Sequence, residues 1–427
     1  MRTYLYILVV SLPFALLGGC ASEHAGSAPP TDAFHYPVSL AVLESGEGGP
    51  NVLYVVSSNF DLLYNRGSVI AIDLDKLGDQ PDGPIAAAVD PERGHVWIDS
   101  FAGLTAAYRP VSAGAGQRTL FVPTRSDNLL YALKADGPLL SCFSGGEGQD
   151  CLSTGIPLAE GETVAEDPFG AAIRGRELFV THLRRPVVDE EFRNSHLVRI
   201  DAESPGAPSF IDIGAAPSEG VVDTPSGLYL TGRSVRDSAG DRSEALRALI
   251  GTAIIDTGVT EATRVKETRG VAVSSDGTRL YVVTRGTRNS QNSPAEGPDG
   301  LLVIDISTDS ATGAARHEVL GFVPMPEGAS RVLSVSRPGM RDLVAVACTE
   351  SDALVIYDDE IGTVARLVEG IAQPYDVVAV TRKAGGKRLF VASFGNHTVD
   401  VVDIPDLQRP GEAKLVGQLG TDSEENP

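Results

Sequence analysis

A short apolar pattern recurs seven times along this chain of 427 residues: a leucine, most often an aromatic residue, and then usually a valine. The copies begin at Leu53, Leu120, Leu178, Leu228, Leu280, Leu343 and Leu389. A second apolar segment follows each copy, at residues 69–74, 129–134, 197–201, 253–256, 301–306, 354–357 and 399–404. Repetition at a spacing of roughly 50 residues indicates one structural unit used many times, rather than several unrelated domains.

Two further apolar segments complete the unit. One precedes the leucine, most clearly at 270–274 and 376–380, and turn residues such as Gly277 and Gly386 join the two. Another follows the second segment, at 318–323, 364–368 and 414–419. Four short strands joined by turns and repeated seven times predict an all-β fold, a seven-bladed β-propeller with four-stranded antiparallel blades. Two β-sandwiches, the competing interpretation, would not produce seven equivalent strands.

The fourth unit contains an insertion, residues 234–250, whose role the sequence does not indicate. We expect a short helix over residues 242–249, and the segment 253–256 is expected to be the third strand of that blade.

The units at 265–306 and 370–404 carry the pattern most clearly, for example as Leu280-Tyr281-Val282 followed by Val303-Ile304-Asp305. This pattern resembles the YVTN-type repeat family of bacterial propellers, within the lactonase-like superfamily. In that family Tyr-Val opens the second strand of a blade and a Val-x-Val-Ile-Asp-like segment forms the third. The resemblance covers the folded body and implies the same propeller architecture. Because Trp97 is the only tryptophan, the Trp-Asp repeat family is disfavoured.

The N-terminus reads as a targeting signal. Arg2 precedes an apolar run over residues 4–17, which at 14 residues is shorter than the roughly 20 needed to span a bilayer as a helix. The run ends in Leu17-Gly18-Gly19-Cys20, which resembles the bacterial lipobox, where the chain is cut before the cysteine and the cysteine receives fatty chains of the palmitate type. The alternatives are a plain secretory signal with an incidental cysteine, or an uncleaved anchor.

These features give the expected organisation of the chain. In lipoproteins of enteric-type bacteria, a residue other than Asp after the lipidated cysteine implies the outer membrane, and here that residue is Ala21. We therefore expect a protein of the bacterial cell envelope that contacts the membrane through a lipid anchor only. The expected parts are a signal peptide at 1–19, a flexible tether at 20–33, the propeller at 34–420 and an acidic disordered tail at 421–427.

Charge limits the partners. The chain carries 35 Lys and Arg against 57 Asp and Glu, for a net charge of −22. Nucleic-acid binding depends on cations that neutralise phosphates, so nucleic acid is not an expected partner of the molecule as a whole. An envelope protein, peptide or polymer is the expected partner.

Besides Cys20, the chain contains three cysteines. Cys142 and Cys151 enclose a glycine-rich loop, and in an oxidising envelope they are expected to form a disulfide, with two free thiols as the alternative. Cys348 lies in an apolar run and is expected to be a core residue.

Linear motifs for catalysis are absent from the sequence: it contains no Cys-x-x-Cys, no His-Glu-x-x-His and no Gly-x-Ser-x-Gly. We expect no cofactor, although a metal ion at the propeller axis remains open.

Arginine is concentrated at equivalent positions of the repeat. Counting five residues on from each repeat leucine gives Ser58, Arg125, Leu183, Arg233, Arg285, Cys348 and Phe394, and Arg184 and Arg185 lie in a neighbouring loop. These positions follow the second strand, so they share one face of the disc, where long loops are typical of a binding site. The functional hypothesis is a face for an anionic ligand or acidic partner. The alternative is that nearby acids neutralise these arginines.

A second set of charged residues precedes the innermost strands and is predicted to surround the axial opening: Asp167, Glu219, Arg269, Arg331 and Asp376. Lactonase-type propellers place metal ligands and catalytic groups near such an opening, whereas the arginines here could simply pair with the acids. We therefore expect a lipid-anchored binding or scaffolding module. The alternative is a lactonase-like or metal-dependent hydrolase with its site at the axis.

Overall fold

The computed structural model describes residues 26–44, 51–78, 81–114, 116–145, 148–160, 163–188, 191–236, 242–286 and 299–420. The expected signal peptide, the lipidation site Cys20 and the acidic tail lie outside these residues. Within them, no helix is long and apolar enough to cross a membrane.

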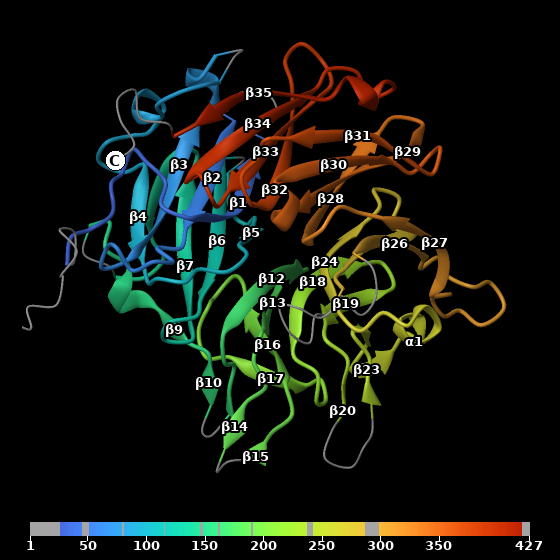
Figure 1. Cartoon of the computed structure of the whole chain (residues 1–427). Helices are drawn as coiled ribbons and strands as arrows, with labels where there is room; N and C mark the ends of the chain where they lie inside the picture. Colours follow the sequence, from blue (N-terminus) through green and yellow to red (C-terminus); the bar gives the residue numbers. More distant parts are fainter. Residues whose placement is uncertain are drawn as a thin grey trace, which may run out of the picture.

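Seven sheets, each with a path of four antiparallel strands, surround a common axis in chain order, so the predicted seven-bladed β-propeller is confirmed (Figure 1). Blade 1 consists of β1 (Pro37–Leu43), β2 (Val52–Ser57), β3 (Gly67–Asp73) and β4 (His95–Ile98). Blade 2 consists of β5 (Ala106–Tyr108), β6 (Gln117–Thr124), β7 (Leu129–Asp136) and β8 (Leu139–Cys142). Blade 3 consists of β12 (Pro168–Arg174), β13 (Glu177–His182), β16 (His196–Asp201) and β17 (Ser209–Asp212). Blades 4 and 5 consist of β18 (Ser218–Thr224), β19 (Gly227–Gly232), β22 (Leu246–Ile250) and β23 (Ala253–Asp256); and β24 (Thr268–Val273), β25 (Arg279–Thr284), β26 (Gly300–Asp305) and β27 (Glu318–Pro324). Blades 6 and 7 consist of β28 (Ala329–Arg337), β29 (Met340–Cys348), β30 (Ala353–Asp358) and β31 (Thr363–Glu369); and β32 (Pro374–Thr381), β33 (Lys387–Ser393), β34 (Thr398–Ile404) and β35 (Lys414–Leu419).

Short elements decorate this ring. In blade 2, β9 (Ile156–Pro157) also pairs with β7. Three small hairpins follow, formed by β10 (Ala159–Glu160) with β11 (Thr163–Val164), β14 (Val187–Val188) with β15 (Glu191–Phe192), and β20 (Val235–Arg236) with β21 (Arg242–Ser243). A single α-helical turn, α1 (Val259–Thr263), follows blade 4.

The repeat leucine explains why the blades stack. Each of the seven leucines lies in the second strand of its blade and is fully buried. Neighbouring residues in a strand point to opposite faces of the sheet, so Tyr54 of β2 packs toward blade 2 while Leu53 and Val55 pack toward blade 7. Both faces of every blade are therefore covered by its neighbours, which accounts for the nearly continuous apolar runs.

The structure corrects one part of blade 4. The segment expected to be a helix forms β21 and β22, and β22 pairs with β19 as the third strand. Residues 253–256, expected to be the third strand, form the fourth, β23. Strand β22 is buried on both sides, and Arg247 in its middle is only 1% exposed. A strand buried on both faces lacks the polar–apolar alternation that would identify it.

Glycines let neighbouring innermost strands approach closely at the axis. A Cβ atom at Gly170 would lie 2.3 Å from the carbonyl oxygen of Glu219, and one at Gly220 would lie 2.8 Å from that of Arg269. Real Cβ atoms do not approach this closely, so only glycine permits this spacing. The backbones of blades 3, 4 and 5 are therefore in near contact around the axis.

The ring closes without exchange of a strand, because every blade is formed by one continuous stretch of chain. Between blade 7 and the segment after β3, the amide of Gly83 donates to the carbonyl of Gln418 at 2.8 Å, and the amide of Gly420 donates to the carbonyl of Gly83 at 3.0 Å. Asp376 of β32 accepts a hydrogen bond from the amide of Leu40 in β1 at 2.8 Å. Closure thus depends on side-by-side packing and a few hydrogen bonds.

The predicted disulfide between Cys142 and Cys151 is confirmed, with Cα atoms 5.4 Å apart. The loop that it closes pairs with β4, where the amide of Trp97 donates to Gln149 at 2.9 Å and the amide of Cys151 donates to Trp97 at 3.0 Å. The disulfide therefore fastens a segment of blade 2 along the outer edge of blade 1. Cys348 is buried, as expected of a core residue.

Candidate functional site

The loops that follow the second strands lie on one side of the disc, which we call the rim face; the turns between first and second strands lie on the opposite side, the hairpin face. A recurrent backbone hydrogen bond fixes these loops. In five blades, a backbone amide just after the second strand donates to a carbonyl just before, or a few residues before, the innermost strand of the same blade, at 2.9–3.2 Å. The donors are Ser58, Arg125, Leu183, Arg285 and Phe394. Sequence counting placed these five residues in equivalent positions, and they are equivalent in the structure.

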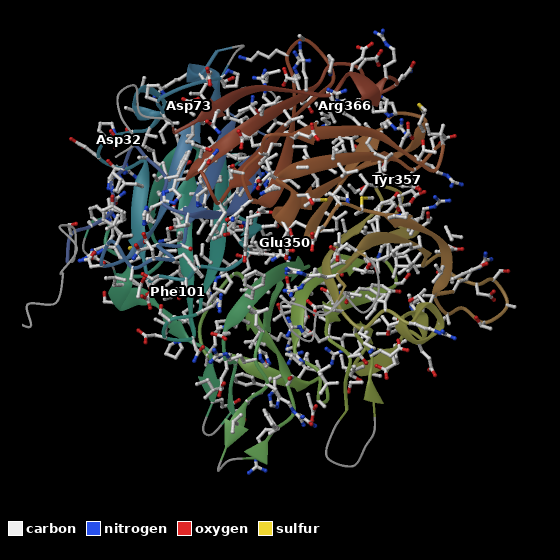
Figure 2. All side chains as sticks on the ribbon, in the orientation of Figure 1. Asp32, Asp73, Phe101, Glu350, Tyr357 and Arg366 are labelled. Atoms are coloured by element: carbon white, nitrogen blue, oxygen red, sulfur yellow. A yellow bond between two sulfur atoms is a disulfide. The ribbon has the colours of Figure 1, made fainter. Side chains whose placement is uncertain are left out.

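The rim arginines each pair with an acid from the following blade. Arg125 lies 3.6 Å from Asp167, Arg233 lies 3.0 Å from Glu267, and Arg285 contacts Glu350. Figure 2 labels Glu350 near the centre of the disc. These arginines are therefore neutralised locally, but by acids across the blade boundary that sequence reasoning had not paired with them.

Two other predicted arginines lie in the loop before β14. Arg184 pairs with Asp167 at 2.7 Å, and its side chain is 71% exposed. Arg185 stacks over Phe192, with its guanidinium carbon 5.3 Å from the ring centre, and Phe192 is itself 66% exposed. Asp167 thus binds two arginines at the rim and does not join the other axial residues.

The axial opening is bridged by Arg331. Its side chain extends from blade 6 across to Glu219 of blade 4, with a nitrogen–oxygen distance of 2.9 Å. The guanidinium carbon also lies 5.0 Å from the ring centre of Phe169 and 5.7 Å from that of Tyr375, in blades 3 and 7. Arg331 is 6% exposed. One side chain therefore connects four blades at the axis.

Glu219 is held by a second arginine. Arg269 of blade 5 lies 2.5 Å from Glu219 and also contacts Glu267. Burial raises the pKa of Glu219, but Arg269 and Arg331 outweigh that effect and hold its pKa below the ordinary value. Conversely, burial lowers the pKa of Arg269, and the two glutamates raise it above the usual value. Glu219 and Arg269 are therefore both ionised at neutral pH. The acidic and basic side chains follow one another in the alternating order Arg233, Glu267, Arg269, Glu219, Arg331.

Asp376 has a different role from the ionised pairs. Besides the Leu40 amide, it accepts a hydrogen bond from the Ser39 hydroxyl at 3.3 Å, and both donors belong to blade 1. Burial raises the pKa of Asp376 to about 6, against the opposing effects of the Leu40 amide and Arg331. This carboxyl joins the last blade to the first.

Some donor capacity at the rim and axis is unused. The Nε atoms of Arg125, Arg269 and Arg331 are buried and have no hydrogen-bond partner in the part of the chain that the structure describes. Among those same residues, no group of three or more His, Cys, Asp or Glu side chains is arranged to hold a metal ion. The groups of the rim face that a ligand can reach are the exposed guanidinium groups of Arg184, Arg233 and Arg285, which suit carboxylate and phosphate oxygens.

Sequence reasoning missed an aromatic group on the rim face of blades 1, 2 and 7. The ring of Phe60 lies 5.7 Å from Phe101 and 5.5 Å from Phe394, and Phe394 stacks on Tyr375 at 5.5 Å. Tyr36 lies 4.7 Å from Phe394. We call Tyr36, Phe60, Phe101 and Phe394 the aromatic patch; Figure 2 labels Phe101 away from the disc centre. Two of these four residues occupy repeat-equivalent positions that the sequence identifies: Phe394, five residues after its repeat leucine, and Tyr36, just before the innermost strand of blade 1.

A cavity of about 660 Å³ lies on the hairpin face, between blades 7 and 1. Three of its cations are paired: Asp403 lies 3.2 Å from Arg382 and accepts from Arg388 at 2.7 Å, and Lys383 lies 2.9 Å from Asp75. This cavity is part of the closure seam, away from the residues considered above.

Known proteins resemble the chain in fold only. No protein-family model matches it, and no curated protein matches it significantly. A hydrazine synthase structure from Kuenenia stuttgartiensis superposes with a TM-score of 0.54 at 12% identity, covering 87% of this chain and 97% of that one. A proposed 6-phosphogluconolactonase from Bacteroides fragilis gives 0.42 at 16% identity, covering 80% and 86%. The β-propeller domain of Cps50 (Swd1) from Myceliophteria thermophila gives 0.48 at 10% identity, covering 87% and 98%. By its own geometry, the chain is a β-propeller.

Proposed function

We propose that this protein is a lipid-anchored module of the bacterial cell envelope, in the outer membrane, that binds a partner carrying anionic groups on its rim face. The partner would be an envelope protein, peptide or polymer. Two features support a location in the cell envelope. One is the Leu17-Gly18-Gly19-Cys20 sequence, and the other is a disulfide, which persists in oxidising compartments. We also propose membership of the YVTN-type repeat family, on the strength of the blade pattern.

The observation that carries the proposal is the row of arginine–acid pairs at the blade boundaries of the rim face. The side chains of Arg184, Arg233 and Arg285 are 71%, 63% and 36% exposed. The pair of Arg285 with Glu350 is exposed on both sides, and such a pair contributes only about 0–1 kcal/mol, because water solvates both partners. Glu267 and Asp167 are only 5% and 15% exposed, but each also contacts a second arginine, Arg269 and Arg125, which would remain when Arg233 or Arg184 binds a partner. A carboxylate or phosphate of a partner could therefore take over the planar donor fork of an arginine at little cost.

The arrangement at the axis favours binding over the alternative of a hydrolase. Glu219 is engaged by two guanidinium groups, and Asp376 accepts from the backbone and side chain of blade 1. A general base or metal ligand needs a lone pair directed at its substrate or metal. Both carboxylates use their oxygens to hold blades together, so scaffolding accounts for them without a reaction.

The binding proposal is tested with two matched triple variants. The test variant is Arg125→Ala/Arg233→Ala/Arg285→Ala. The control is Arg176→Ala/Arg199→Ala/Arg316→Ala, which removes three arginines of comparable exposure from outer positions. We expect envelope components that co-purify with the wild-type protein to be retained by the control and lost by the test variant, at equal thermal stability. Equal retention by both variants would sink the arginine hypothesis.

The anchor is tested separately. Cys20→Ser is expected to release the protein from the membrane fraction without changing the fold, since the cysteine lies outside the propeller. Continued sedimentation of Cys20→Ser with membranes after a high-salt wash would count against lipidation.

A further inference from the structure

The loop between β2 and β3 presents two apolar side chains to solvent. Phe60 is 51% exposed and Leu62 is 55% exposed. Phe60 sits at the edge of the aromatic patch, within 5.5–6.1 Å of Phe394, Phe101 and Tyr36. A cluster of exposed apolar residues on a soluble domain marks a surface that contacts something else.

This loop is rigid although it is exposed. The Asn59 side chain accepts from the amide of Tyr64 at 3.1 Å, and donates to the Tyr64 carbonyl at 2.8 Å and to the Ser100 hydroxyl at 3.0 Å. Asn59 and Leu62 have φ values of 49° and 58°, in the left-handed region that residues other than glycine rarely adopt. These bonds hold Leu62 in an unfavourable backbone conformation that projects it outward. The loop would therefore lose little conformational entropy when a partner binds to it.

The N-terminal segment reaches the body at this same loop. The amide of Asn65 donates to the carbonyl of Ser27 at 3.0 Å, and its side chain donates to the carbonyl of Gly26 at 2.9 Å. Cys20 and Gly26 are six positions apart in the sequence. At about 3.5 Å per residue, even a fully extended chain spans only about 20 Å. If Cys20 carries lipid, the loop is therefore held close to the membrane surface.

We propose that the aromatic patch and Leu62 dock onto the lipid surface that anchors Cys20, so that the rim face of blade 1 is turned toward the membrane. This inference rests on the lipid anchor of the proposed function. Apolar side chains such as Phe60 and Leu62 enter the boundary between head groups and acyl chains, where the amphipathic rings of Tyr36 and Tyr64 are also stable. Because the tether makes this contact intramolecular, even a weak interfacial affinity is enough to orient the disc.

The test compares labels on the two faces of the full-length lipidated protein in phosphatidylcholine vesicles. An environment-sensitive fluorophore is attached to Leu62→Cys or to Ile361→Cys. Ile361 is 65% exposed and lies in the turn between β30 and β31, on the hairpin face. We expect blue-shifted emission at position 62 that brominated lipid quenches, and unshifted, unquenched emission at position 361. Adding Phe60→Ser should abolish the quenching at position 62 while the protein stays bound to vesicles.

Each other outcome has a definite meaning. If both variants sediment with vesicles and neither is quenched, the anchor stands and the docking is wrong. A blue shift at position 62 without quenching would mean that protein covers the loop, which also overturns the docking. If neither variant remains with the vesicles, the lipid anchor itself fails, and this inference fails with it.

Discussion

Arg331 crosses the axis of the propeller to pair with Glu219, a residue two blades away, at 2.9 Å. Adjacent blades could be held by their shared apolar cores alone, but this bond links blades that do not touch through those cores. It therefore fixes the diameter of the axial opening, and it makes the rim face a rigid platform.

Removing this arginine should destabilise the whole ring. Arg331→Met leaves the buried Glu219 with one guanidinium partner in place of two. Removing one partner of a buried ion pair lowers the free energy of unfolding by about 3 kcal/mol, and urea unfolding measures this decrease. The control Arg176→Ala, which breaks an exposed pair with Asp201, should cost less than about 1 kcal/mol. Adding Glu219→Gln to Arg331→Met should recover part of the loss; no recovery would mean that the ion pair is not its cause.

Stability should depend on pH through Asp376. Its pKa is raised to about 6 in the folded protein, against 3.8 ordinarily, so the folded state holds this proton more tightly than the unfolded state. The stabilising contribution of this carboxyl to the free energy of unfolding is present below pH 4 and is lost as the pH rises toward 6 and above. In Asp376→Asn the side chain stays neutral, so the difference in melting temperature between variant and wild type should grow in favour of the variant from pH 4 to pH 7. A constant difference would show that Asp376 is not titrating in this range.

Buried histidine acts in the opposite direction, so the comparison with Asp376→Asn must be made at each pH. Burial lowers the pKa of His182 to about 4. The unfolded state then binds the proton more readily, and stability falls as the pH drops from about 6.5 toward 4. Wild type and Asp376→Asn both contain His182, so the difference between their melting temperatures at a given pH does not include the effect of this histidine.

The glycines at the axis should not tolerate even one methyl group. In Gly170→Ala the added Cβ would meet the carbonyl oxygen of Glu219 at 2.3 Å, so blades 3 and 4 must move apart, at a cost of about 2–3 kcal/mol. The matched control is Gly321→Ala in β27, where nothing lies within 4 Å of the added atom. Thermal unfolding should separate the two variants by about 2–5 °C; equal melting temperatures would refute close approach at the axis.

The disulfide should contribute through the loop that it closes. Cys142 and Cys151 are nine positions apart, and cross-linking a loop of this length removes about 2–3 kcal/mol of unfolded-state entropy. The double variant Cys142→Ser/Cys151→Ser should therefore unfold at a lower urea concentration than wild type. Reductant should lower the midpoint of the wild type and leave that of the double variant unchanged. A shift in both would point to another reducible group.

The sequence allowed the blades to be predicted because the repeat leucine and the apolar residue after it point to opposite faces of the second strand, so the pair indicates burial on both sides in every blade. It misled in blade 4 because residues 245–249 are apolar apart from the buried Arg247, without the alternation typical of a strand exposed on one side. Counting along the repeat gave Arg125, Arg233 and Arg285 the same position in their blades. Their partners Asp167, Glu267 and Glu350 belong to the following blades, and that proximity arises only when the ring is assembled.

The axial set was predicted as a group, and only part of it is one. Glu219, Arg269 and Arg331 are in contact, whereas Asp167 lies at the rim with Arg125 and Arg184. Asp167 precedes β12, whereas Glu219 and Arg269 are the second residues of β18 and β24. The residue of β12 in their position is Phe169, so the alignment of blade 3 by its apolar segments was shifted by two residues.

Because no blade borrows a strand from the other end of the chain, each sheet is complete within its own segment, and every inter-blade linker is topologically equivalent. Phe34 and Gly420 are packed against each other, since a Cβ on Gly420 would lie 2.5 Å from the Phe34 ring. The ends of the disc could thus be joined by a short peptide and the chain reopened in another linker, giving a circular permutant with all seven sheets intact. The position of the termini is therefore not dictated by how the ring folds.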